Sequence, residues 1–289
     1  MGTIAGRYDA AAEAYETWWA PVLRPSALCL LDLAEPLPRG GTATILDVGT
    51  GSGTLALAAI RRWPRARAVG IDGSRGMLGA AEAAAASLPP ADRRRLSLVE
   101  GLAERIPLDD GSVDVVVSSF VLQLVPSRAR ALAEARRVLV PGGTLAFVTW
   151  RATDGPVFGP DDVFYEVLDD LGIPDELEAE EARTGDPVSA AAAVAQVRRA
   201  GFRDVTGHEE LLVHRYDPAA YPRFLEEYAE RETFEGLEPA VAAEVRALAT
   251  ERLAELARRD PDAFVWRSPI VYVRGTRPPA PRPGRGGGR

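Results

Sequence analysis

The sequence predicts an α/β fold in which helices cover both faces of a mostly parallel sheet. Apolar segments alternate with helical segments through the first half of the chain. The apolar segments carry few polar residues, as in "SVDVVVSSF" at 112–120, which is typical of parallel strands buried on both faces. Proline or "PGG" follows the helical segments, as expected of stop signals. We expect strands at 42–49, 66–72, 95–101, 112–120 and 144–150, with helices between them at 54–63, 74–88 and 127–139.

Segments outside this alternation predict a helical cap and a disordered end. Residues 7–34 read as helical, with breaks around Pro21 and Pro25. After Trp150 we expect helices at 161–172, 188–202 and within 217–260, strands at 203–216 and 263–275, a solvated acidic loop at 175–181 and a disordered tail at 277–289. The chain then forms one domain over 1–276, with an N-terminal helical lid at 1–34, a ligand-binding core at 40–150 and cap insertions at 152–187 and 217–260.

Composition and charge exclude several kinds of site. The formal net charge of −8 argues against a broad nucleic-acid-binding surface. The chain has no lysine, which excludes a lysine Schiff base and a Walker-type phosphate site. Its single cysteine, Cys29, excludes disulfides within the chain and cysteine-ligated metal clusters, and its two histidines make a His-rich metal site improbable, so we expect no metal. No apolar run approaches the roughly 20 residues of a membrane span, and residues 1–19 lack a signal core, so a cytoplasmic protein is expected.

The stretch "TILDVGTGSGTLALAAI", residues 44–60, predicts a ligand-binding turn between a buried strand and a helix. Gly49 permits the tight turn, and Gly51 and Gly53 leave room where a side chain would clash with a ligand. Asp72 ends the next strand, and in an open parallel sheet both features lie at the carboxyl edge, where ligands bind. A carboxylate there can accept hydrogen bonds from both hydroxyls of a ribose. These residues together indicate an adenosine-type cofactor.

The glycine spacing separates two cofactor classes. Dinucleotide sites use G-x-G-x-x-G/A, whereas the glycines here stand at 49, 51 and 53. "LDVGTGSG" resembles motif I of the class I S-adenosylmethionine (SAM) dependent methyltransferases. The resemblance continues in order through "VGIDGSRGML", "VEGLAERIPLDDGSVDVVVSSFVLQLVP" and "EARRVLVPGGTLAFVTW". "YDAAAEAY" near the N-terminus is similar to the first helix of the ubiquinone/menaquinone-biosynthesis-like small-molecule methyltransferases. The family implies a Rossmann-like doubly wound sheet of seven strands, with the last strand antiparallel, and a helical cap.

The resemblance also implies a set of cofactor-binding residues. Asp72 would bind the ribose hydroxyls, and Asp47 would orient the glycine turn or meet the amino group of SAM through water. Ala103 would offer its backbone N–H to the adenine, near which Met77 packs. The full set carried over by position is Tyr8, Tyr15, Asp47, Gly49, Thr50, Gly51, Gly53, Asp72, Gly73, Met77, Leu102, Ala103, Ser119 and Phe120.

Three of these positions, Leu102, Tyr8 and Tyr15, bear on how the cofactor is held. The family has an acidic residue where this chain has Leu102, so the adenine is held by packing and backbone alone, or Glu104 reaches in. Losing one hydrogen bond costs about 0.5–1.5 kcal/mol, which weakens binding without overturning the assignment. Tyr8 and Tyr15 would cover the cofactor from the N-terminal helix, and ordinary packing is an equal alternative for them.

Catalysis in this family depends on alignment of the acceptor with the methyl group, and a base helps when the acceptor is a hydroxyl or an acidic carbon. The family topology makes the strand at 203–216 parallel, so its carboxyl end faces the cofactor side. His214 stands at that end and is our candidate catalytic base. Gln123 and Arg151, which follow two other strands, are the alternative polar contacts.

The variable segments predict a small, apolar or aromatic substrate. Aromatic residues expected to rim one pocket, or alternatively to bury the underside of the cap, are Trp18, Trp19, Trp150, Phe158, Phe164, Tyr165, Tyr221, Phe224 and Tyr228. The segment "SSFVLQLVP" lacks the Asn/Asp-Pro-Pro-Tyr motif of enzymes that methylate adenine or glutamine.

Three functions remain after this reading. A small-molecule methyltransferase acting on O, N or C is the main prediction. A SAM-binding protein without methyl transfer is the second, and an NAD(P)-linked oxidoreductase is disfavoured by the glycine spacing and by the missing Tyr-x-x-x-Lys pair. A monomer and a homodimer are both open.

Overall fold

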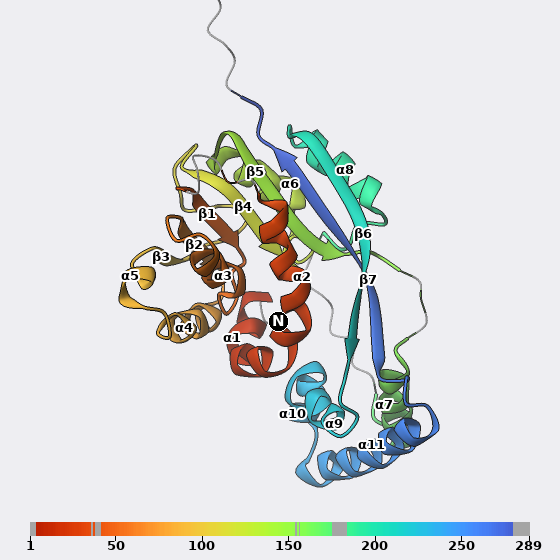
Figure 1. The fold of residues 1–289 in the computed structure, drawn as a ribbon. Coiled ribbons are helices and arrows are strands. Elements are labelled where there is room, and N and C mark those ends of the chain that lie inside the picture. The colour runs from red at the N-terminus through yellow and green to blue at the C-terminus, as the bar shows by residue number, and fades with distance from the viewer. Residues whose placement is uncertain are drawn as a thin grey trace, which may run out of the picture.

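A seven-stranded sheet forms the centre of the molecule (Figure 1). The computed structural model describes residues 4–35, 37, 42–153, 155, 157–174 and 184–279. The strand order is β3-β2-β1-β4-β5-β7-β6, and β7 alone runs antiparallel to its two neighbours. The strands are β1 (Thr44–Val48), β2 (Arg67–Asp72), β3 (Leu96–Glu100), β4 (Val113–Ser119), β5 (Leu139–Trp150), β6 (Arg203–Arg215) and β7 (Val265–Thr276). This arrangement confirms the predicted fold class.

Helices cover both faces of the sheet, as the apolar strands require. One face packs against α2 (Ala20–Leu33) and α3 (Thr54–Arg62), which supply Leu30 and Leu55 to the core. The other face packs against α6 (Arg128–Val138) and α8 (Ala190–Arg199), which supply Leu132 and Val197. The remaining helices are α1 (Ile4–Ala14), α4 (Arg75–Ala85), α5 (Pro90–Arg93), α7 (Gly159–Asp170), α9 (Tyr221–Phe224), α10 (Arg231–Gly236) and α11 (Pro239–Arg259).

The parallel strands bring the predicted site residues to one edge. The glycine turn follows β1, Asp72 ends β2, and Gly101 follows β3. Ser119 ends β4 and Trp150 ends β5. Because these strands are parallel in register, their carboxyl ends lie side by side, and everything that follows them meets over the same edge of the sheet.

The N-terminal helices differ from the prediction of breaks around Pro21 and Pro25. The chain is helical from Ile4 to Leu33, and its irregularity is a π-helical segment, η1 (Tyr15–Trp19). The Ala20 N–H donates to the Tyr15 carbonyl across this wider turn. Pro21 then falls in the first turn of α2, where a missing N–H costs nothing, and Pro25 is accommodated inside the helix. The helix therefore continues past both prolines.

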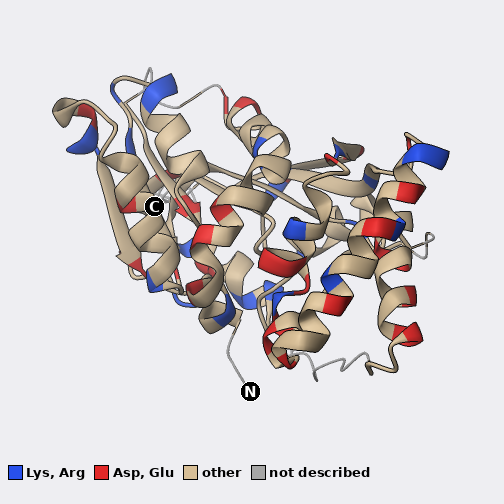
Figure 2. Cartoon of the chain, turned by 90° about the horizontal axis from the view of Figure 1, so that it is seen from below, with Lys and Arg blue, Asp and Glu red and all other residues tan. Residues whose placement is uncertain are grey.

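The helical cap has its own apolar core, to which Phe164, Tyr221 and Phe264 contribute. It is built from α7, from α9–α11 and from a second π-helical segment, η3 (Leu225–Ala229). Figure 1 shows these helices together at the far end of the long antiparallel pair β6 and β7. Figure 2 shows acidic and basic positions interspersed over the helices, and ion pairs such as Arg252–Asp170 and Arg246–Glu226 join cap helices. The predicted acidic loop at 175–181 lies outside the described residues.

The end of the chain is tied to the sheet at the beginning of the predicted tail. The Arg277 N–H donates to the Gly143 carbonyl at 2.8 Å, and the Gly142 N–H donates to the Arg277 carbonyl at 2.9 Å. Arg277 is thus ordered, contrary to a disordered tail that starts at this residue, while 280–289 lie outside the described residues. Among the residues that the structure describes, no helix combines the length and apolar character needed to cross a membrane.

Candidate active site

The glycine turn after β1 has the backbone conformation that only glycine adopts easily. Gly49, Gly51 and Gly53 have φ angles of 70°, 53° and 88°. The N–H groups of Gly49 and Thr50 donate to the Ile71 carbonyl at 2.8 and 2.9 Å, which ties the turn to β2. A Cβ on Gly49 would lie 2.2 Å from Cγ2 of Val121, whereas a Cβ on Gly51 would meet nothing within 4 Å. The turn is therefore packed tightly against Val121 at Gly49, whereas it is open at Gly51.

Asp72 closes the turn from the neighbouring strand. Its carboxylate accepts from the Gly51 N–H at 2.8 Å and from the Ser74 N–H at 2.9 Å. Burial raises the pKa of Asp72, and the hydrogen bonds from Ser74, Gly51 and Gly73 oppose that rise. The side chain is thus fixed next to the open side of the turn, where its remaining lone pairs can accept from a ligand.

Asp47 lies beneath the turn and is 1% exposed. It accepts from the Thr50 hydroxyl at 2.7 Å and from the Ala56 N–H at 3.1 Å, which joins the turn to the first turn of α3. Burial raises the pKa of Asp47 to about 7, although these two hydrogen bonds lower it. The buried carboxyl has no cationic partner among its hydrogen bonds to described residues, and a cation placed nearby would favour its ionised form.

A cavity of about 730 Å³ extends over the carboxyl edge of β1 to β5. The size falls within the roughly 300–1,000 Å³ of pockets that enclose small ligands. Eleven of the residues expected at the site line it: Tyr8, Tyr15, Gly49, Gly51, Asp72, Gly73, Met77, Leu102, Ala103, Ser119 and Phe120. Asp47 and Thr50 instead line a small adjoining hollow of about 40 Å³, and Gly53 lines neither space.

Gly53 has a different place from the other two glycines. It is the N-cap residue of α3, and a Cβ there would lie 3.2 Å from the Ala81 Cβ. Gly53 therefore permits close packing of α3 against α4. The glycine spacing suggested that it leaves room for a ligand, but in the structure it occupies a packing position.

His214 is not among the residues that line the cavity, so the structure does not bring this candidate base to the site. It stands on β6 with its ring 4.5 Å from the Tyr216 ring, centroid to centroid, and burial lowers its pKa. The strand is parallel to β5, as expected, but β7 lies between them. Two strand spacings place β6 about 10 Å from β5. Arg151 also does not line the cavity and pairs with Glu209 at 3.3 Å, whereas Gln123 does line it.

The predicted aromatic residues divide between the cavity and the cap. Trp19, Trp150 and Tyr228 line the cavity. Phe164, Tyr221 and Phe224 are at most 5% exposed and pack in the cap core, with Trp18, Phe158 and Tyr165 against them. For these six residues the alternative reading, burial of the underside of the cap, is the one that holds.

Sequence reasoning missed part of the wall. Leu124, Val125 and Pro126 follow β4 and line the cavity, as do Ile4, Ala5 and Asp186. The Thr184 N–H donates to the Val125 carbonyl at 2.8 Å, and the Gly185 N–H donates to the Gln123 carbonyl at 3.1 Å. These bonds bring Asp186 to the site from a segment far along the chain, and no local pattern marks it. Glu104, named as the alternative partner for adenine, also lines the cavity.

Helix α1 closes the cavity from above and is held by Asp9. The Asp9 carboxylate accepts from the Ser74 hydroxyl at 2.5 Å and from the Gly76 N–H at 2.7 Å, at the start of α4. On the other side, the Arg231 guanidinium donates to the Ala10 carbonyl at 2.6 Å. Helix α1 has no fully buried residue, and these contacts tie it to α4 and α10.

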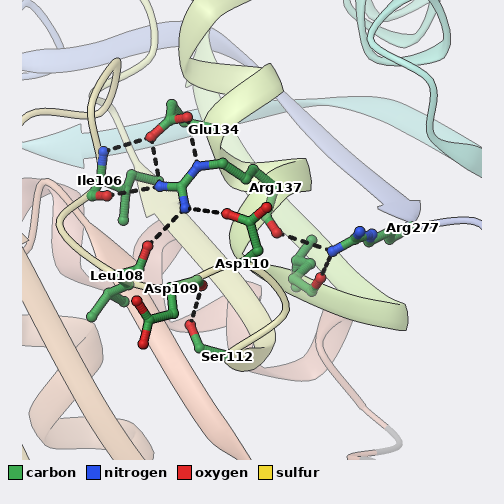
Figure 3. A network of polar contacts seen from close by, with 9 residues as sticks. Ile106, Leu108, Asp109, Asp110, Ser112, Glu134, Arg137 and Arg277 are labelled. Carbon is green, nitrogen blue, oxygen red and sulfur yellow. Dashed lines mark hydrogen bonds and ion pairs between the residues drawn. The ribbon is translucent and has the colours of Figure 1, made fainter.

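A network around Arg137 holds the loop that forms the wall beyond β3 (Figure 3). Its guanidinium donates to the carbonyls of Ile106 and Leu108, each at 2.8 Å, and to carboxylate oxygens of Glu134 and Asp110. These side-chain hydrogen bonds raise the pKa of Arg137 and lower that of Glu134. The loop carries Leu102, Ala103 and Glu104 into the cavity wall, so α6 positions this wall from outside.

Replacing Arg137 with methionine is expected to lower the free energy of unfolding by about 2–3 kcal/mol, since hydrogen bonds to a charged group are lost from a partly exposed site. Chemical denaturation measures the loss. Arg136→Met, at the exposed neighbouring position on α6, is the control and should change little. Equal stability of the two variants would contradict a role for the network in holding the loop.

The open glycine turn and the fixed carboxylate of Asp72 share one cavity with an aromatic end at Trp150. Among the described residues no group of three or more His, Cys, Asp or Glu side chains is placed to hold a metal ion. The open turn at Gly51 and the fixed carboxylate of Asp72 suit the adenosine and amino-acid parts of SAM.

Comparison with known proteins agrees with this geometry. Residues 46–147 match the family described as "Methyltransferase domain". The ubiquinone/menaquinone biosynthesis C-methyltransferase UbiE of Syntrophotalea carbinolica is 35% identical over 127 residues, which cover 44% of this chain and 52% of that protein. Trans-aconitate 2-methyltransferase of an Azoarcus species is 36% identical over 125 residues, covering 43% and 46%. The chain thus spans about half the length of these curated relatives.

A solved structure extends the likeness in fold. The Haemonchus contortus phosphoethanolamine N-methyltransferase 2, in complex with phosphomonomethylethanolamine and S-adenosylhomocysteine, superposes with a TM-score of 0.58 at 16% identity. The match covers 96% of this chain and 61% of that one. It shows the same fold around nearly the whole of this chain.

Proposed function

Because residues 46–147 of this chain are a methyltransferase domain of the class I SAM-dependent type, we propose that the protein transfers the methyl group of SAM to an O, N or C atom of a small molecule. The observation that supports this proposal most directly is that the cavity is continuous. It runs from the open turn at Gly51 and the carboxylate of Asp72 to an aromatic end at Trp150. The net charge of −8 argues against a broad nucleic-acid-binding surface, which supports a small-molecule substrate in place of nucleic acid. We also propose a cytoplasmic protein that is a monomer or a homodimer.

The residues around the turn would hold SAM. Asp72 would accept from the two ribose hydroxyls, and Asp47 would favour the positively charged amino group. Leu102, Ala103 and Met77 would enclose the adenine. When bound, SAM supplies an electrophilic methyl group on a sulfonium centre. The fit of SAM to this turn rests on Gly51. The space where its Cβ would lie is open, and any larger residue there would fill that space.

The chain's own residues would act by alignment and by excluding water. Ser119 and Phe120, at the end of β4, lie between the cofactor side and the aromatic end of the cavity. Trp19, Trp150 and Tyr228 close that end, so an acceptor there is held dry and directed toward the cofactor. Alignment of two reactants can contribute about 7–11 kcal/mol to a barrier, and catalysis here then requires no histidine.

Methyl transfer is tested by incubating the protein with SAM and mixtures of small molecules and measuring S-adenosylhomocysteine by mass spectrometry. We expect its release above the background without an acceptor, and a product heavier by one methyl group. SAM binding without turnover on any mixture would support the second function, a SAM-binding protein that transfers no methyl group.

Asp47 should make SAM binding depend on pH. A carboxyl with a pKa of about 7 loses its proton as the pH rises through neutrality, so affinity for the cationic amino group should rise over the same range. In the ligand-free protein, the effect of rising pH on the free energy of unfolding has the opposite sign to its effect on affinity. The raised pKa favours folding most below about pH 4, and this contribution is lost as the pH rises through about 7.

Asp47→Asn keeps an oxygen for Thr50 and Ala56 and removes the titration. We expect its SAM dissociation constant to be flat between pH 6 and 8 and its melting temperature at pH 8 to be higher than that of the unaltered protein. Titrations and melting curves at several pH values provide the check. A variant with the unaltered pH dependence would show that another group titrates, and Asp72 is then the nearest candidate.

We further propose that residues 1–34 form a lid that opens to exchange cofactor and product. Asp9→Ala removes the acceptor that ties α1 to α4, so we expect a several-fold rise in KM for SAM and faster hydrogen exchange in residues 4–14. Glu13→Ala, on the same helix, is the control. If protection in residues 7–20 is the same with and without S-adenosylhomocysteine, α1 is a fixed wall and the lid is ruled out.

A further inference from the structure

The aromatic residues of the cavity form one continuous belt. Phe120 and Trp150 have ring centroids 4.3 Å apart, and Trp150 and Trp19 are 6.4 Å apart. From Trp19 the contacts continue to Tyr228 at 6.0 Å, to Tyr15 at 6.2 Å from Tyr228, and to Tyr8 at 5.9 Å from Tyr15. All six residues line the cavity. The belt therefore runs from the cofactor side to the acceptor side, and its π faces attract positive charge.

Two π-helical segments build the middle of this belt. Tyr15 and Trp19 belong to η1, and Tyr228 belongs to η3. The Trp18 indole N–H donates to the Glu227 carboxylate at 2.8 Å, which joins the two segments beside the belt. The rings are thus held by structure on both sides of the cavity, and their arrangement is set before a ligand arrives.

The charged residues of the cavity are all acidic among the described residues. Asp72, Glu104 and Asp186 line it, and no arginine or histidine from the described part of the chain does. Arg128 interacts electrostatically with Asp186 and does not line the cavity. Its guanidinium donates to the carbonyls of Leu122 and Gly185 and to the Gln196 side chain. An anionic acceptor such as a carboxylic acid would meet no cation among the described residues that line the cavity.

Three polar side chains of the cavity, Gln123, Tyr15 and Tyr228, are not suited to remove a proton from a hydroxyl. Gln123 donates to the Phe120 carbonyl at 2.7 Å and accepts from Thr149 at 2.9 Å, so both ends of its amide are used. Burial raises the pKa of Tyr15 and of Tyr228, so both phenols stay neutral at physiological pH. A nucleophile that brings its own lone pair needs none of these three groups as a base during the transfer.

We infer that the acceptor is an amine, recognised by the aromatic belt and by the acidic lining, and that the reaction is an N-methylation. This inference rests on the proposed function. An amine enters as its cation, loses its proton to solvent before the lid closes, and attacks as the neutral base. The nitrogen lone pair forms the new N–C bond while the C–S bond breaks and its electron pair stays on sulfur. The positive charge passes from sulfonium to ammonium along the belt, and S-adenosylhomocysteine leaves as a neutral thioether.

Binding of matched pairs tests the recognition without turnover. The protein loaded with S-adenosylhomocysteine is titrated with trimethylammonium compounds and with their neutral tert-butyl isosteres, on phenethyl, indolylethyl and alkyl skeletons. We expect the cation to bind about tenfold tighter than its isostere on the skeleton that fits. The proposal is overturned if no cation binds better than its neutral partner, or if the matching carboxylates bind best.

Turnover assays and variants distinguish N-methylation of an amine from the broader proposal of methyl transfer to any small molecule. On matched amine, alcohol and acid acceptors we expect methylation of the amine, and methylation of an alcohol or acid alone would overturn the amine while leaving the methyltransferase intact. Absence of S-adenosylhomocysteine binding would overturn both. Trp150→Leu should abolish the preference for the cation and Trp150→Phe should keep part of it. Trp63→Leu, outside the cavity, should keep all of it.

Discussion

Replacing Asp72 with alanine is expected to weaken SAM binding by at least a hundredfold. The carboxylate would accept two charge-assisted hydrogen bonds from the ribose, each contributing about 1.5–3 kcal/mol, and 1.4 kcal/mol corresponds to a factor of ten. The substitution also removes the acceptor for the Gly51 and Ser74 N–H groups, which loosens the turn itself. Isothermal titration with S-adenosylhomocysteine measures the loss.

A neighbouring carboxylate provides the control. Glu100 stands opposite Asp72 in the β2–β3 register, pairs with Arg75 at 2.8 Å and does not line the cavity. Glu100→Ala should bind S-adenosylhomocysteine as the unaltered protein does. An unchanged dissociation constant for Asp72→Ala would mean that Asp72 is not the ribose ligand.

Replacing Gly51 with alanine should remove SAM binding while the protein stays folded. The added methyl group would enter the space that we assign to the ligand, and its only cost to the ligand-free protein is the positive φ, about 1–2 kcal/mol. We expect a loss of affinity beyond a hundredfold and a melting temperature lowered by a few degrees. Calorimetry of both processes provides the measurement.

Substitutions at two other glycines distinguish the effect of backbone strain from the effect of steric obstruction. Gly142 has a φ of +84° and no atom within 4 Å of an added Cβ, and it lies in the first half of β5 and does not line the cavity. Gly142→Ala should therefore cost similar stability and leave binding intact. Gly49→Ala should unfold the protein more readily, since its Cβ would overlap Val121 at 2.2 Å. Normal binding by Gly51→Ala would contradict the placement of the cofactor.

Local sequence patterns were sufficient for the strands and for the residues around the glycine turn that line the cavity. The apolar run before Gly49, the glycine turn and Asp72 at the end of β2 are set by residues close together in the chain, and the parallel order of the strands brings them to one edge. Leu102 and Ala103 follow the next strand in the same way. Periodicity and turn residues report on this level of structure.

The acceptor half depends on contacts between distant segments, and there the prediction was weaker. His214 was placed by the direction of its strand, but the position of β7 between β5 and β6 decides that it lies away from the cavity. Trp19 and Tyr228 meet across more than 200 residues, while Phe164 and Tyr221 pack inside the cap. Nothing in the local sequence distinguishes an aromatic ring that faces a cavity from one that fills a core.

Titration of the unaltered protein with SAM, S-adenosylhomocysteine and NADH tests the central claim most directly. The turn at Gly49–Gly53 has the spacing of a site without a pyrophosphate, and the cavity above it is continuous with the acceptor side. We predict one molecule of SAM or of S-adenosylhomocysteine bound per chain and no measurable heat from NADH. Saturable binding of NADH, with none of either SAM or S-adenosylhomocysteine, would contradict the account.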